Sequence, residues 1–143
     1  MDQELVAEPR NRELLAYLER QAVPRTVKNA SPWDVDEFEL HVHPDLTEVL
    51  DNLVSETKGA WSVALFGCVG AVREGVLFAF VQGIGLLGLR TPVGGIDIRL
   101  GPSAIADLGD DWSAIEPFPM DVSSSMGRQL LLEAFHLASA RAS

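Results

Sequence analysis

The sequence has little cysteine and little positive charge. Its 143 residues include one cysteine, Cys68, so no internal disulfide can form. There are 11 basic residues against 21 acidic ones, which gives a formal net charge of −10 at pH 7. Nucleic-acid binding depends on lysine and arginine side chains that neutralise phosphates, so a chain this acidic is repelled by the duplex. We therefore expect no direct binding of nucleic acid, and an anionic membrane surface is disfavoured for the same reason.

Long hydrophobic runs are also lacking. The most apolar stretch, residues 75–89, is too short to span a bilayer and contains the polar Gln82. The chain opens with the acidic residues Asp2 and Glu4, and no apolar segment of the kind found in signal peptides follows them. These features predict a cytoplasmic protein that does not associate with membranes.

Motifs that carry catalysis are absent as well. The sequence contains no G-x-S-x-G elbow, no H-E-x-x-H pair and no P-loop. The letters from Gly83 to Gly88 match the G-x-G-x-x-G dinucleotide fingerprint, but Pro92 follows too soon for the helix that would hold a pyrophosphate. We expect a glycine-rich hairpin there, with no cofactor. Cys68 lies in an apolar stretch and is expected to be a small core residue. Together these observations favour a protein without catalytic activity of its own.

The residues that are present predict one globular domain with a real core. The chain is 47% hydrophobic and 22% charged, and a chain of this length buries roughly two-thirds of its unfolded surface. Apolar residues recur at helical spacing in three segments. The predicted helices cover residues 9–22, 44–58 and 124–141.

Between the second and third helices the pattern is typical of strands. The predicted strands cover residues 61–66, 69–73, 76–81, 85–90, 96–100 and 112–115, with a short helical turn at 102–108. Turns of one or two residues force neighbouring strands to run antiparallel. The predicted fold class is therefore α+β: an antiparallel meander of about five to six strands packed with helices, plus an N-terminal helical arm. Near-continuous apolarity in the third and fourth strands predicts that helices or another chain cover both faces of the sheet.

A loop-like, acidic segment separates the first helix from the rest. It runs from Pro24 to His43 and includes the acidic residues Asp34, Asp36 and Glu37. This segment predicts a division into an N-terminal helix and acidic linker arm, residues 1–43, and an α+β domain, residues 44–143.

Two histidines form a weak candidate for a metal site. On a strand, residues two apart point to the same side, so His41 and His43 could both reach one ion. A third ligand could be His136 or one of the acids between Asp34 and Glu39. The alternative is a pair of surface histidines, with His43 beside Pro44 capping the helix that follows.

Two arginines and one tryptophan are candidates for binding. Arg90 and Arg99 flank a short loop and could together hold an anionic group. The alternative is that they form salt bridges with Glu74 and Asp97. Large aromatic side chains mark both cores and interfaces. We expect Trp61 in the core, and Trp33 as the tryptophan that meets a partner or a second subunit.

From Leu65 onward, the order of features resembles the N-terminal domain of the TfoX/Sxy family. The resemblance covers about residues 60–141 and rests on short motifs. They are Leu65-Phe66-Gly67, Glu74-Gly75, Leu77-Phe78-Ala79, Leu87-Gly88-Leu89-Arg90 and Pro117-Phe118 before the closing helix. It implies a small α+β domain, and regulators that act through other proteins rather than as enzymes. The basic pair often seen before the Phe-Gly motif is replaced by Ser62, Val63 and Ala64, and an acidic arm precedes the domain, which weakens any inference of a nucleic-acid role.

The leading functional hypothesis is a non-enzymatic interaction or regulatory module whose partner is a protein or a second copy of the chain. It rests on the doubly apolar sheet and on the lack of a catalytic constellation. The alternative hypothesis is a small-molecule or metal-binding protein or enzyme, with a pocket between the sheet and the C-terminal helix. That pocket would use Arg90, Arg99 or the His41/His43 pair.

Overall fold

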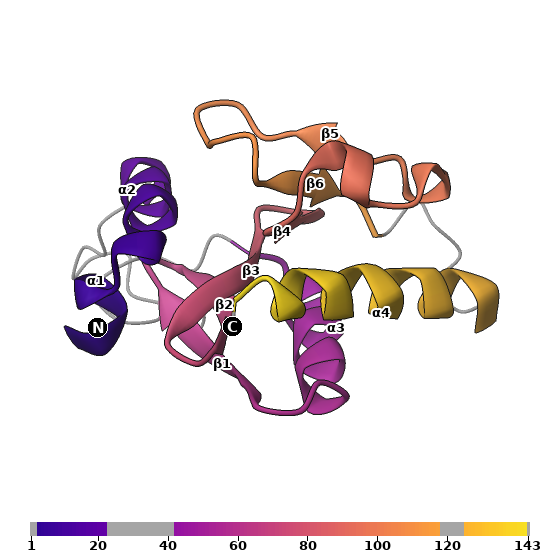
Figure 1. The fold of residues 1–143 in the computed structure, drawn as a ribbon, viewed down its shortest axis with the longest axis horizontal. Coiled ribbons are helices and arrows are strands. Elements are labelled where there is room, and N and C mark those ends of the chain that lie inside the picture. The colour runs from indigo at the N-terminus through magenta and orange to yellow at the C-terminus, as the bar shows by residue number, and fades with distance from the viewer. Residues whose placement is uncertain (1–2, 23–41, 118–124, 143) are drawn as a thin grey trace.

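The computed structural model describes residues 3–22, 42–117 and 125–142. Its centre is one six-stranded sheet in the order β1-β2-β3-β4-β6-β5, and every neighbouring pair is antiparallel. The first four strands follow one another as a meander. Helices pack on the sheet from two sides (Figure 1). The predicted α+β class and antiparallel meander are confirmed.

The strands of the meander match the predicted ones to within a residue or two. The bounds are β1 Ala60–Leu65, β2 Cys68–Arg73, β3 Val76–Gln82, β4 Leu86–Leu89, β5 Ser103–Ala104 and β6 Ser113–Ile115. Two tight turns join the first three strands. Phe66-Gly67 has φ values of 49° and 81°, and Glu74-Gly75 has 54° and 80°. Two consecutive positive φ angles are what a type I′ hairpin turn requires, which explains a glycine at the second position of each.

The three predicted helices are present. The N-terminal segment contains α1 (Gln3–Ala7), the 3-10 helix η1 (Pro9–Asn11) and α2 (Arg12–Gln21). The other two are α3 (Pro44–Ser55) and α4 (Ser125–Ala140). Pro44 begins α3 because the missing N–H of proline costs nothing in a first helical turn. Each helix turns a row of leucines or a phenylalanine toward the sheet.

Two cores lie on opposite faces of the sheet. On one face α3 and α4 pack against the strands, and Phe135 of α4 contacts Phe78 of β3 with ring centroids 5.0 Å apart. On the other face α1, α2 and the segment around Trp112 pack against Phe80. β3 is buried on both sides along almost its whole length. The prediction that both faces are covered is confirmed, and the cover comes from helices of the same chain (Figure 1).

Two local predictions are wrong. Residues 96–100 do not form a strand. The segment instead contains the 3-10 helix η4 (Ile98–Leu100), and another, η3 (Val93–Gly95), lies just before it. The Asp97 side chain caps η4 by accepting the Arg99 backbone N–H at 2.9 Å, and Gly101 ends it in the left-handed region. At 102–108, where a helical turn is expected, β5 pairs with β6 and is followed by one turn closed by the Leu108 N–H and the Ile105 carbonyl at 3.2 Å. Val42, near the end of the predicted loop, forms an isolated parallel bridge with Gly83.

Candidate functional site

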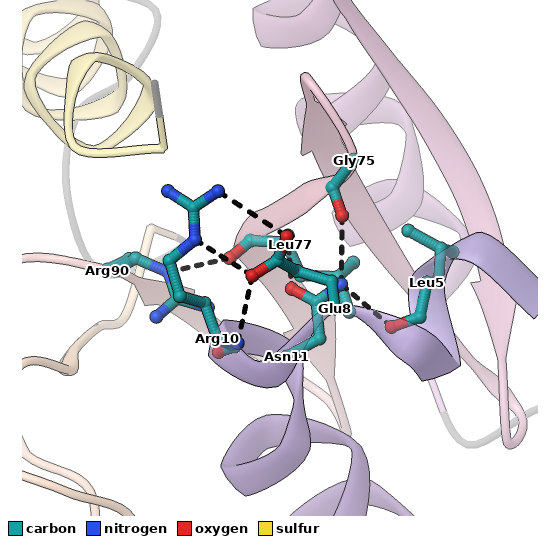
Figure 2. Close-up of polar contacts among 7 residues, drawn as sticks. All are labelled: Leu5, Glu8, Arg10, Asn11, Gly75, Leu77 and Arg90. Carbon is teal, nitrogen blue, oxygen red and sulfur yellow. Dashed lines mark hydrogen bonds and ion pairs between the residues drawn. The ribbon is translucent and has the colours of Figure 1, made fainter.

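A polar network joins the N-terminal segment to β3. β4 pairs with β3 only as far as Ala79, so Leu77 needs other hydrogen-bond partners. The Leu77 N–H donates to Asn11 Oδ1 at 2.8 Å, and the Leu77 carbonyl accepts from Arg90 Nε at 2.7 Å (Figure 2). Asn11 Nδ2 donates to the carbonyls of Leu5 and Gly75 at 3.0 and 2.9 Å. Asn11 is completely buried. The Asn11 side chain therefore makes hydrogen bonds that a neighbouring strand would otherwise make, and it fixes η1 on the sheet.

Arg90 completes the same network. Its backbone N–H donates to the Phe78 carbonyl at 2.8 Å, and Nη2 donates to the Arg10 carbonyl at 3.0 Å. The guanidinium lies 4.6 Å from the centroid of the Trp112 ring, a cation–π arrangement. Burial, followed by the charge of Arg10, lowers the pKa of Arg90. Arg10 itself pairs with Glu8 at 2.9 Å (Figure 2). The contacts of Arg90 are those of a residue that holds the fold together.

Arg99 is engaged elsewhere. Its Nε and Nη2 bind the two carboxylate oxygens of Asp97 at 3.0 and 2.7 Å, and this pairing lowers the pKa of Asp97 to about 2. The next charge that acts on Arg99 is Glu133 of α4, whereas Arg90 contacts Trp112 on the other face. The two arginines therefore have different partners, and the structure does not bring them together around one anionic group. The salt bridge between Arg99 and Asp97 is the one that the alternative interpretation predicts.

His43 has the role of a cap. Its Nδ1 accepts the backbone N–H of Asp45 at 3.1 Å at the start of α3, as the alternative to metal binding predicts. His41 lies outside the described residues, and so does Trp33. His136 lies on α4 with Nε2 3.3 Å from the Glu56 carbonyl. Within the described ranges, no group of three or more His, Cys, Asp or Glu side chains is placed to hold a metal ion.

The glycine fingerprint is part of a hairpin, as predicted. Gly88 pairs with Phe80 across β3 and β4, and a Cβ at Gly88 would lie 2.2 Å from the Phe80 ring. The glycine therefore makes room for an aromatic ring that also contacts Tyr17 and Trp112. Cys68 is a buried core residue on the same face, and burial raises the pKa of its thiol to about 11. A thiol with that pKa is a poor nucleophile at neutral pH.

The surface grooves of the described residues carry few polar side chains. One of about 430 Å³ lies at the β3–β4 turn, beside Gln82, Ile84 and Glu116. Another, of about 170 Å³, lies between η3, η4 and α4, where Asp97 and Glu133 stand among leucines. A third, of about 410 Å³, lies between α3 and α4 beside Asn52 and Arg128. None of the three gathers several polar groups around one point, as a small-molecule site does. Each helix within the described ranges is too short or too polar to cross a membrane.

The most unusual surface is the outer edge of β1. Trp61 is 43% exposed there, so the expectation that it lies in the core is wrong, and Trp112 is the buried tryptophan instead. Ser62 is also exposed. β1, with the sequence AWSVAL, has neither a charged residue nor a proline, and no described strand pairs with its outer side. Sequence reasoning missed this surface. The available signal was the position of β1 as the first strand of a meander, which puts it at an edge.

Comparison of the chain with protein-family models, with curated proteins and with solved structures gave no match.

Proposed function

We propose that this chain is a non-enzymatic, cytoplasmic interaction or regulatory module, and that it binds protein by strand addition at the outer edge of β1. The observation that carries the proposal is the exposed, uncharged edge. Natural sheets protect their edges with charged residues, proline, bulges or very short strands, because a free edge offers backbone N–H and C=O groups to any extended chain. β1 has neither of the first two protections and is six residues long.

The other edge of the sheet, formed by β5, is protected by its short length. β5 has only two residues, Ser103 and Ala104, and so offers little backbone to a partner. Strand addition takes affinity from main-chain hydrogen bonds and specificity from alternate side chains. At β1 the exposed side chain that can supply specificity is Trp61, a residue type enriched at interaction hot spots.

The faces of the sheet do not serve this purpose, because the chain's own helices cover them. A sheet that is apolar on both faces needs a cover on each face. The chain's own helices provide this cover, so the apolar faces give no reason to expect a partner there. The resemblance to the TfoX/Sxy N-terminal domain supports the same proposal, since it implies regulators that act through other proteins.

Site-specific photo-crosslinking tests the proposal. A photoreactive phenylalanine analogue replaces Trp61 in one variant and the exposed Glu19 of α2 in a matched control. Both variants are irradiated in lysate of the source organism. We expect a discrete protein adduct, either to another protein or to a second copy of the chain, at position 61 and not at position 19. Equal adducts at both positions, or none at position 61, would contradict strand addition at β1.

A further inference from the structure

We infer that the partner at β1 is a second copy of this chain, paired antiparallel about a two-fold axis that passes through Ser62. The inference rests on the proposed function and deepens it. It follows from three properties of β1: which backbone groups face outward, which side chains share a face, and where charge is missing.

The backbone of β1 allows this register. Leu65 and Cys68 flank a two-residue turn, so they form a hydrogen-bonded pair, and the pairs alternate from there along the strand. The N–H and C=O groups of Ser62 and Ala64 therefore point away from β2. Ala60 shares that direction, and its N–H already donates to the Thr57 carbonyl at 3.2 Å. In the dimer the two Ser62 residues exchange hydrogen bonds, and each Ala64 N–H donates to the C=O of the partner's Ala60.

The side chains of β1 complement themselves in the same register. Val63 and Leu65 belong to the core on the α1/α2 face, so Trp61 lies on that face by the alternation of a strand. A two-fold axis at Ser62 sets Trp61 opposite the partner's Val63. Pairs of an aromatic and a β-branched residue are among the favourable cross-strand pairs. On the other face the pairing brings together only the small residues Ala60, Ser62 and Ala64.

Charge and symmetry favour a copy of the chain over an extended array. Two chains of net charge −10 repel each other, but β1 itself adds no like charge to the contact. Head-to-tail pairing would need a second long edge, and β5 has only two residues. Pairing of β1 with β1 uses the same patch on both copies and closes at two. The contact is small, so we expect a dissociation constant of about 10 μM to 1 mM.

Sedimentation analysis of the purified full chain over a concentration series tests the inference. Ser62→Pro removes an outward N–H and leaves the N–H groups that β1 directs to β2 in place, which an edge strand tolerates, and Ser62→Lys places two cations at the axis. Ser55→Lys makes the same charge change at an exposed position at the end of α3. We expect the native chain and Ser55→Lys to dimerise with rising concentration. Both Ser62 variants should stay monomeric, with unchanged circular dichroism and at least a tenfold weaker association.

Each other outcome overturns the inference. A native chain that stays monomeric up to about 1 mM has no dimer at this edge. Ser62 variants that dimerise as well as the native chain place the contact elsewhere. Assemblies larger than two exclude the closed symmetry. The proposed function and this inference are tested separately. If the chain stays monomeric but position 61 still crosslinks to another protein, strand addition at β1 is retained and only self-pairing is rejected.

Discussion

The helices on the two faces of the sheet are held by different chemistry. On the α3/α4 face the core is apolar, and Phe135 packs edge-on against Phe78 with an interplanar angle of 66°. Its polar contacts lie at the margin, where Arg73 Nη1 donates to the Ser139 carbonyl at 3.3 Å. On the α1/α2 face an apolar core is joined by a buried hydrogen-bond network around Asn11 and Arg90. Apolar packing tolerates small adjustments, whereas a buried polar network stabilises only when every group has its partner. The first face should therefore respond to side-chain volume, and the second to the loss of single hydrogen bonds.

The largest expected effect is on the apolar face. Phe135→Ala deletes a completely buried ring and should lower the free energy of unfolding by about 3–5 kcal/mol, measured by urea denaturation. Phe135→Leu, which keeps most of the volume, should cost much less. Equal losses for the two variants would show that volume does not govern this face.

The polar face should respond to Asn11→Ala. This substitution leaves the Leu77 N–H and the carbonyls of Leu5 and Gly75 without their partner, and should cost roughly 2–4 kcal/mol. Amide exchange at Leu77 should accelerate with it. Arg12→Ala, at an exposed position one residue later, is the matched control and should stay within about 0.5 kcal/mol of the native chain. An Asn11 variant as stable as the Arg12 variant would remove the contrast between the faces.

Gly88→Ala tests how tightly the α1/α2 face is packed. Its Cβ would meet the Phe80 ring at 2.2 Å, so the ring must move, at a cost of about 2 kcal/mol. The near-ultraviolet circular dichroism of Trp112, which contacts that ring, should change as well. Gly94→Ala is the control, because its Cβ meets nothing within 4 Å, and it should be neutral. Two neutral variants would mean that the face is loosely packed.

The smallest effect is a pH dependence from Cys68. Burial raises the pKa of this thiol to about 11 in the folded chain, from 9.0 without that burial. Between those values the folded state keeps a proton that the unfolded state has lost, so stability falls as the pH rises. At pH 10 the loss should be about 1 kcal/mol relative to Cys68→Ala. The pKa of Tyr17 is raised as well, first by burial and then by the charge of Cys68, so Cys68→Ala removes part of that shift and the difference between the two chains reports both groups. Parallel stability curves for the two chains between pH 8 and 10.5 would contradict a dry environment at Cys68.

Periodicity was sufficient to predict most of the fold. The leucines of α3 and the hairpin turns at Gly67 and Gly75 are local signals, and the elements they predict are present. The strand predicted at residues 96–100 was wrong because the apolar residues Ile96, Ile98 and Leu100 alternate with polar ones, as they would in a strand. The capping carboxylate of Asp97 decided their conformation instead. Alternation reports which side chains are apolar and carries no information about such a cap.

The roles of Asn11 and Trp61 were harder to predict from the sequence. The role of Asn11 depends on Leu77, 66 residues away, which lies beyond the last pair between β3 and β4. Before the fold is known, an asparagine at the start of a helix reads as an ordinary cap. Trp61 was misplaced for a related reason, since its size suggests burial and only the strand order puts it at an edge. Both residues acquire their roles from contacts, or missing contacts, far along the chain.

The separation between Asn11 and Leu77 also has a consequence in time. At about 5–20 residues per second, a ribosome needs roughly 3–13 s to make the 66 residues between them. Throughout that interval the leucines of α2 have no completed sheet to pack against, and a ten-residue helix without tertiary packing is only marginally stable. The N-terminal segment can therefore reach its final contacts only after β3 has been made.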